Sequence, residues 1–202
     1  MLRFDPDTHT YWLGDAKVPS VTTILKPLTD LSAIPRDVLQ YAADRGTAVH
    51  YGTELYDTDQ LDWGSLTDEL VPYIEAWAEF RAITGFRPEL IEARVSHPGL
   101  FYAGTLDRTG IINGERAILD IKTSKTMYPT VGMQLAAYAE ALHAAQPEQD
   151  RHTARYAVQL KDDGTWALHQ YADPTDWPTF VAMRTLVGWA DKHNQRISYD
   201  PR

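Results

Sequence analysis

Two short segments of the sequence, GTLD and LDIKT, contain charged residues that could form a catalytic site. These residues are Asp107, Asp120 and Lys122. Asp120 and Lys122 are two positions apart in an apolar run typical of a buried strand, so both side chains project from the same face. Charged groups on such a face cost free energy unless they are paired or bind something. An Asn-Gly turn signal at 113–114 would fold Asp107 back toward the same end of the sheet as Asp120.

Carboxylates that converge in a chain without cysteine would form a hard, oxygen-rich site, which suits Mg²⁺ or Mn²⁺ rather than a soft metal. The Lys122 ammonium fits beside such a cation if the substrate is an anion on which negative charge develops. Hydrolysis of a phosphodiester has these needs. The metal polarises a phosphoryl oxygen and lowers the pKa of a bound water, and the lysine stabilises charge or helps to orient and deprotonate the water. The site alone leaves other phosphate esters open.

The composition excludes several other classes of protein. Of the 202 residues, 44% are hydrophobic, which is enough for a core and argues against intrinsic disorder. The chain has no cysteine, which excludes disulfides, thiolate catalysis, cysteine-bound zinc and cysteine-ligated iron–sulfur clusters. The formal charge of −9 argues against a protein that coats nucleic acid, but not against an enzyme that grips DNA in one groove.

The chain has no internal repeat and no low-complexity tract, and its length suits a single domain. No apolar stretch approaches the roughly 18 residues of a membrane span. The first ten residues are charged and polar, unlike a secretory signal. We therefore expect a cytoplasmic protein that does not contact a membrane.

Local patterns predict the elements of the N-terminal half. Short apolar runs around turn residues predict a hairpin over 2–13, and Ser20 is placed as the N-cap of a helix. A longer helical pattern opens at Pro35. It contains Gly46 and Gly52, which mark either a break in the helix or the close approach of another group.

Alternating helical and period-two patterns fill the rest of the chain. Their order predicts an α/β fold, a mixed central β-sheet flanked by helices, with an N-terminal β-hairpin and helical extension. We expect helices from Leu66 to a stop at Gly85, over 130–145 and after Asp173-Pro174, and strands over 90–95, 100–112, 116–123, 154–161 and 165–171.

Five motifs follow one another along the chain: RGTAVH, which ends at His50, Glu92 on the first expected core strand, GTLD, LDIKTSK, and QLAAY, which contains Gln134 and Tyr138. In these motifs the sequence resembles the PD-(D/E)XK nuclease superfamily and, within it, the RecB-like exonucleases. The N-terminal run HTYWLGDAKVPSVTTIL is similar to the start of phage-encoded and mitochondrial members. Leu106 stands where the superfamily usually has a proline before its first aspartate, as in many RecB-like members.

The resemblance implies a restriction-endonuclease-like core in a single nuclease domain over 1–202. Residues 1–34 would be the N-terminal hairpin and helix extension, and residues 35–202 the helices and the nuclease core.

The resemblance also implies a metal site. Asp107 and Asp120 would bind one or two Mg²⁺ or Mn²⁺ ions with help from the carbonyl group of Ile121. His50 and Glu92 would be further ligands, or would hold the ligands in place.

Catalysis and DNA contact are implied for the neighbouring residues. Lys122 would be the catalytic lysine. Gln134 and Tyr138, one helical turn apart, would face the site and orient Lys122 or a phosphate. Further basic and hydroxyl residues are candidate contacts to DNA phosphates: Lys125, Ser124, Thr123, Arg108 and Arg45.

Ordinary structural roles stay open for the same residues. Asp107 and Asp120 could be a turn cap and an ion-pair partner of the lysine. His50 could be a hydrogen-bonded helix residue, and Glu92 a charge at the sheet edge that pairs with Arg94. The two polar residues of QLAAY could be edges of a packed helix, and each candidate phosphate contact could be a solvated surface group.

The leading hypothesis is a metal-dependent DNA exonuclease of phage or prophage type, which hydrolyses phosphodiester bonds from a DNA end in recombination or DNA processing. A catalytically weak module of the same fold, which binds DNA ends or serves assembly, is the alternative; the charge of −9 favours it because a processive DNA enzyme usually needs a positive groove. A third hypothesis is a ring of subunits around a DNA channel. The expected partners are single- or double-stranded DNA ends, further copies of the chain, and a single-strand annealing or recombination protein, in the bacterial host cytoplasm if the protein is phage-encoded.

Overall fold

Five strands form the central sheet, in the order β4-β5-β6-β7-β8. The computed structural model describes residues 1–29, 31–145 and 153–197, and the five strands lie within them. β6 and β7 run parallel and the other neighbours antiparallel, so the sheet is mixed, as expected. The strands are β4 (Arg87–His97), β5 (Tyr102–Ile112), β6 (Glu115–Lys122), β7 (Ala154–Leu160) and β8 (Trp166–Gln170).

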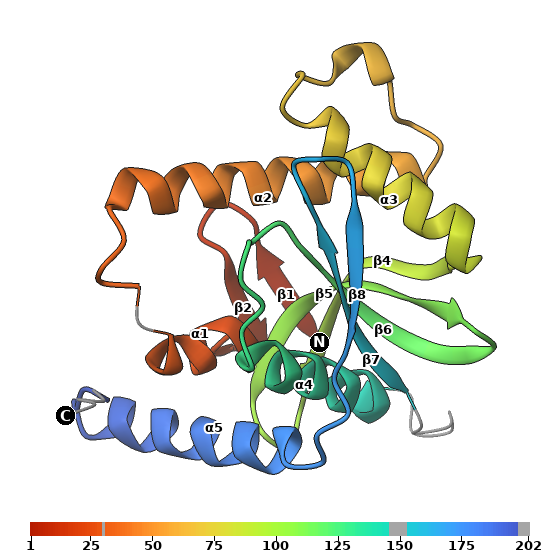
Figure 1. Cartoon of the computed structure of the whole chain (residues 1–202). Helices are drawn as coiled ribbons and strands as arrows, with labels where there is room; N and C mark the ends of the chain where they lie inside the picture. Colours follow the sequence, from red (N-terminus) through yellow and green to blue (C-terminus); the bar gives the residue numbers. More distant parts are fainter. Residues whose placement is uncertain (30, 146–152, 198–202) are drawn as a thin grey trace.

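Helices cover both faces of this sheet (Figure 1). They are α1 (Val21–Leu25), α2 (Arg36–Asp57), α3 (Val71–Thr84), α4 (Thr130–Ala145) and α5 (Asp176–Lys192). α2 and α3 lie on one face, and α4 covers the other with α1 and α5 packed beside it. Successive residues of β6 divide between the two cores, since Ile118 packs with α4 and α5 residues and Leu119 with α3 residues. The expected α/β architecture is therefore confirmed.

A second, smaller sheet precedes this core. It consists of β1 (Leu2–Asp5), β2 (Thr10–Leu13) and β3 (Ala16–Val18), which are antiparallel, so the expected hairpin gains a third strand. Ser20 then caps α1 as expected, because its hydroxyl accepts a hydrogen bond from the Thr23 amide.

The small sheet is tied to β5, the strand that carries Asp107. The Tyr11 hydroxyl hydrogen-bonds the Thr105 hydroxyl at 2.8 Å, and the Ala103 amide donates to the Pro19 carbonyl at 3.1 Å. Tyr11 and Ala103 also belong to one small buried apolar cluster. The sheet is thus held beside the end of β5 at which GTLD lies.

The structure corrects the start of one expected helix and shows that another is continuous. The helix expected from Leu66 begins only at Val71. Leu66 and Leu70 precede this helix and still pack against the core. A short 3₁₀ helix, η2 (Trp63–Ser65), lies before them. Apolar residues can therefore have the spacing of a helix in a segment that is not helical. α2 does not break at its glycines. At Gly52 a methyl group would lie 2.7 Å from Ile74 Cδ1, so this glycine permits the close approach of α3.

β4 also begins three residues earlier than the pattern predicted, at Arg87, with a shift of register between Pro88 and Leu90. The expected domain over 35–202 includes residues 146–152 and 198–202, which lie outside the described residues. Across the described ranges, no helix has both the length and the apolarity needed to cross a bilayer.

Candidate active site

The β5–β6 hairpin brings the two aspartates together. Asn113 and Gly114 have φ values of 52° and 83°, as a tight two-residue turn requires. Arg108 pairs with Leu119 at the end of the β5–β6 ladder, next to Asp107 on one strand and Asp120 on the other. Asp107 Oδ2 accepts a hydrogen bond of 2.6 Å from the Ile121 amide. Both carboxylates are thereby fixed at one end of the sheet.

A cluster of possible metal ligands forms where α2 meets this end of the sheet. His50, Glu92 and Asp107 each offer one ligand atom, and these atoms all lie within 4.8 Å of one another. His50 Nδ1 is 3.5 Å from Glu92 Oε1 and 3.6 Å from Asp107 Oδ1. His50 Nε2 is 3.0 Å from the Ile121 carbonyl oxygen. The ring is therefore held by the backbone at one nitrogen and faces two carboxylates with the other.

The electrostatics of this cluster suit a cation. Burial alone would lower the pKa of His50, but the carboxylates of Asp107 and Glu92 outweigh it and raise the pKa to about 9. Without a metal, the imidazolium supplies the positive charge between these groups. Two carboxylates and one imidazole nitrogen fit a divalent cation such as Mg²⁺ or Mn²⁺, and the Ile121 carbonyl keeps a second lone pair beside them.

Asp120 lies next to the cluster and is paired with Lys122. Lys122 Nζ is 2.6 Å from Asp120 Oδ2, a buried oxygen. Burial raises the pKa of Asp120, although Lys122 opposes this. Burial would lower the pKa of Lys122, but Asp120 and Asp107 raise it, so the amine stays an ammonium. Asp120 thus lies beside the cluster but outside the three ligand atoms that are within 4.8 Å of one another.

Gln134 on α4 connects the members of this pair. Its Nε2 donates to Asp120 Oδ1 at 2.9 Å, and its Oε1 accepts from Lys122 Nζ at 3.3 Å. Tyr138, one turn further along α4, is buried against Gly104, where a methyl group would come within 2.5 Å of the Tyr138 ring. The glycine of GTLD thus makes room for the tyrosine of QLAAY.

Arg108 is placed differently from the expectation. Its side chain is fully buried, with Nε 2.6 Å from Asp57 Oδ2, Nη1 3.0 Å from Glu92 Oε1 and Nη2 3.0 Å from the Thr53 hydroxyl. It cannot reach a DNA phosphate, so the structure contradicts its assignment as a DNA contact. Glu92 has a φ of 47°, a strained value for a non-glycine residue, and the Arg108 bond holds its carboxylate toward His50.

The sequence reasoning missed the residues behind Arg108. Asp57, at the end of α2, is fully buried and also binds Arg81 Nη1 at 2.7 Å and Trp77 Nε1 at 2.9 Å. No motif contains Asp57 or Arg81, and each follows helical spacing as a surface charge would. Only the packing of α2 against α3 and β5 reveals that they support Arg108.

The other candidate DNA contacts lie in and beside the loop that follows β6. Arg45 Nη2 is 3.4 Å from the Thr123 carbonyl oxygen. The Ser124 hydroxyl donates to the Thr126 carbonyl, and Gln159 Nε2 donates to the carbonyls of residues 124 and 125. The Lys125 side chain is exposed. The loop backbone is fixed near Lys122, but these side chains do not line the groove that holds the carboxylates.

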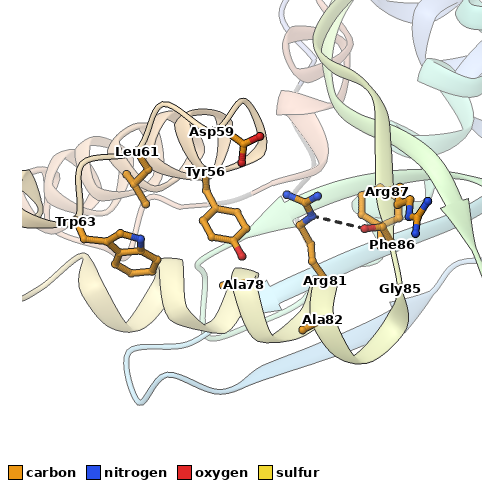
Figure 2. Close-up of a pocket in the computed structure, with 10 residues that line it drawn as sticks. All are labelled: Tyr56, Asp59, Leu61, Trp63, Ala78, Arg81, Ala82, Gly85, Phe86 and Arg87. Carbon is orange, nitrogen blue, oxygen red and sulfur yellow. Dashed lines mark hydrogen bonds between the residues drawn. The ribbon is translucent and has the colours of Figure 1, made fainter.

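That groove has a volume of about 840 Å³. Asp107, Asp120 and Lys122 line it, together with residues of α2 and of the β1–β2 hairpin. A separate cavity of about 580 Å³ lies where the end of α2, η2 and the end of α3 meet (Figure 2). Among the described residues that line this second cavity, Asp59 is the one carboxylate, so it offers no comparable ligand set.

A family model of the PD-(D/E)XK nuclease superfamily matches residues 26–194. The match includes every candidate ligand and the Asp120–Lys122 pair, and it leaves out β1, β2 and β3. The search of curated proteins returned no match. With most of its length matched, and with a group of possible metal ligands beside the strand that carries Asp120 and Lys122, the chain belongs to the PD-(D/E)XK nuclease superfamily.

Proposed function

We propose that this protein is a metal-dependent DNA exonuclease. Membership of the superfamily implies a metal-dependent nuclease that hydrolyses phosphodiester bonds in DNA. The observation that carries the proposal is the group of His50, Glu92 and Asp107 ligand atoms, all within 4.8 Å of one another, beside the Asp120–Lys122 ion pair.

The residues of the site would have separate roles in metal binding and catalysis. His50, Glu92 and Asp107 would hold the cation, with Asp120 and the Ile121 carbonyl completing its oxygen ligands. When bound, the ion would polarise a phosphoryl oxygen and make a neighbouring water more acidic.

Lys122 would stabilise the negative charge that develops on the phosphate. Its position between two carboxylates favours this role over that of a base, because they hold the proton on the amine. Gln134 would hold the side chains of Lys122 and Asp120 in place through its two hydrogen bonds. Arg108 would keep the Glu92 carboxylate turned toward His50.

The test is degradation of end-labelled DNA by purified protein with Mg²⁺ or Mn²⁺. We expect cleavage that a chelator abolishes, and a loss of about 100-fold or more in Asp107→Asn and Lys122→Ala. Lys192→Ala changes an exposed lysine at the end of α5 and should leave the rate unchanged. Equal rates in wild type and both site variants would remove the assignment.

Exonuclease action needs its own substrate. A closed circular single strand offers no end, so an exonuclease should leave it intact while it degrades the same strand after linearisation. Cleavage of both forms at one rate would identify an endonuclease. Phage origin, a recombination partner and a cytoplasmic location stay predictions.

One observation supports the catalytically weak alternative. The net charge of −9 disfavours contacts to DNA phosphates, and such contacts supply most non-specific affinity. A module of that kind would bind labelled DNA ends without cleaving them in either metal, which the same assay detects.

A further inference from the structure

The N-terminal sheet forms one side of the catalytic groove. Phe4 on β1, His9 in the turn and Tyr11 on β2 line the same groove as Asp107 and Asp120. This sheet lies outside the superfamily match, which begins at residue 26. The Tyr11–Thr105 hydrogen bond anchors it two residues from Asp107. A wall so close to the candidate ligands is placed to contact the substrate.

The two sides of the groove present aromatic rings. Phe4 packs on His9 with ring centroids 5.2 Å apart, and His9 is exposed at the turn. Tyr51 on α2, which also lines the groove, directly follows His50 and is 60% exposed. Phe4 is half-buried, with the Arg94 guanidinium 4.8 Å from its ring centroid, so His9 and Tyr51 are the exposed rings. Exposed rings beside a charged site are groups on which nucleobases stack.

The charges that line the groove make stacking more important. Arg94, Lys122 and two histidines, His9 and His50, are its basic side chains, against the four carboxylates of Glu54, Glu92, Asp107 and Asp120. A metal bound at His50 would replace the proton that this ring carries in the metal-free protein. A bound divalent cation would cancel an excess of two negative charges, but it would not make the groove positive, so few phosphate contacts remain to supply affinity. Stacking of a base on an aromatic side chain contributes about 1–3 kcal/mol and does not depend on positive charge.

We propose that the groove takes a single-stranded DNA end, with its bases stacked on Tyr51 and on the Phe4–His9 wall. Unpaired bases present both faces to such rings, whereas the bases of a duplex are stacked on one another. The proposal rests on the proposed nuclease function and adds the class of DNA. It also assigns the N-terminal sheet a role in substrate choice.

The test compares two substrates of the wild-type full chain, an end-labelled oligo(dT) and a blunt duplex, each about 12 nucleotides long, which is within the span of one single-strand binding site. We expect kcat/KM to be at least about 10-fold higher for oligo(dT). Tyr51→Ala should raise KM for oligo(dT) about 10-fold, which corresponds to the loss of one base stack, and leave kcat nearly unchanged.

Two variants control for other effects. Tyr51→Phe keeps the ring and should keep the wild-type KM. Trp189→Ala removes a ring of similar exposure, 54%, from α5, where it does not line the groove, and should change neither constant. KM should also respond weakly to salt, with a log–log slope of about 1.4 for two phosphate contacts to a single strand.

Each outcome decides between the two claims. Cleavage of the duplex as fast as oligo(dT), or an unchanged KM in Tyr51→Ala, overturns the inference and leaves the nuclease assignment intact. If neither DNA is cleaved, the nuclease proposal fails, and fluorescence anisotropy with labelled oligo(dT) and duplex then decides the inference. Preferential binding of the single strand that Tyr51→Ala weakens would support it, and equal binding of both would reject it.

Discussion

At the scale of single residues, Arg108 is a charge that folding has enclosed completely. Its guanidinium binds Asp57, Glu92 and Thr53, and Asp57 is itself fully buried. A charge in such a place is stable only while its partners remain, since removal of one partner leaves the other buried and unpaired. Arg108 therefore both stabilises the packing of α2 and holds the carboxylate of Glu92, a candidate metal ligand.

We expect Arg108→Met to lower the free energy of unfolding by about 3 kcal/mol, the lower end of the cost of breaking a buried ion pair, because Arg81 still binds Asp57. Urea denaturation measures this change. Arg36→Met, at an exposed position at the start of α2, should change stability little. Equal stability of the two variants would show that the buried network does not support the fold.

His50 makes the stability of the metal-free protein depend on pH. Its pKa rises to about 9 in the folded state from an ordinary value of 6.5. A raised pKa gives stability that is fully present below pH 6.5 and is lost as the pH rises through about 9.

The expected result is that wild type exceeds His50→Gln in the free energy of unfolding at pH 6, and that this difference shrinks toward pH 9.5. Urea denaturation of both proteins in a chelator, at several pH values, measures it. A difference that stays constant over this range would mean that His50 is not protonated between the carboxylates.

The residues that the sequence could identify are those in local motifs. Asp120, Lys122 and Gln134 keep fixed spacings on one strand and one helix, and the structure brings them into contact. Asp57 could not be identified, because its burial depends on three elements that meet only after folding. Arg108 was misassigned for the same reason, since an arginine next to a catalytic aspartate has no sequence feature that separates burial from exposure.

At the scale of elements, α4 and β5 are fitted to each other at one glycine. Gly104 leaves room for the Tyr138 ring, where a methyl group would come within 2.5 Å. Tyr138 is on the helix that also carries Gln134, so a shift of the ring would move the group that bridges Asp120 and Lys122.

Gly104→Ala should therefore lower the free energy of unfolding by about 1–3 kcal/mol, the usual cost of overpacking, and lower nuclease activity. Gly46→Ala is the matched comparison. Its methyl group would meet nothing closer than the Thr123 hydroxyl at 3.9 Å, so it should raise stability by up to about 1 kcal/mol through helix propensity. Thermal unfolding of the two variants checks the opposite signs, and a neutral Gly104→Ala would contradict the close fit.

Periodic patterns predicted most elements, and tertiary contacts explain the exceptions. The strands and α4 follow their patterns because burial of one face imposes the period. The start of α3 was placed too early because Leu66 and Leu70 pack on the core without being helical. The continuity of α2 through Gly52 depends on its contact with Ile74, which no single-segment pattern contains.

At the scale of the whole molecule, the groove is assembled from parts that are distant in the sequence. The N-terminal sheet, α2, the β5–β6 hairpin and α4 each contribute to it, and the sheet lies outside the superfamily match. The sequence predicted the hairpin but not its place beside the carboxylates, because Tyr11 and Thr105 meet only across the fold. Under the two proposals, a bound cation and base stacking would take the place of a positive surface in a chain of charge −9.

The central claim is that His50, Glu92 and Asp107 hold a divalent cation, and titration calorimetry with Mn²⁺ tests it most directly. The account predicts saturable binding to wild type, and affinity lowered by about 10-fold or more in Asp107→Asn, which stays folded by circular dichroism. Lys192→Ala should bind as wild type does. No binding to wild type, or the same affinity in Asp107→Asn, would contradict the account.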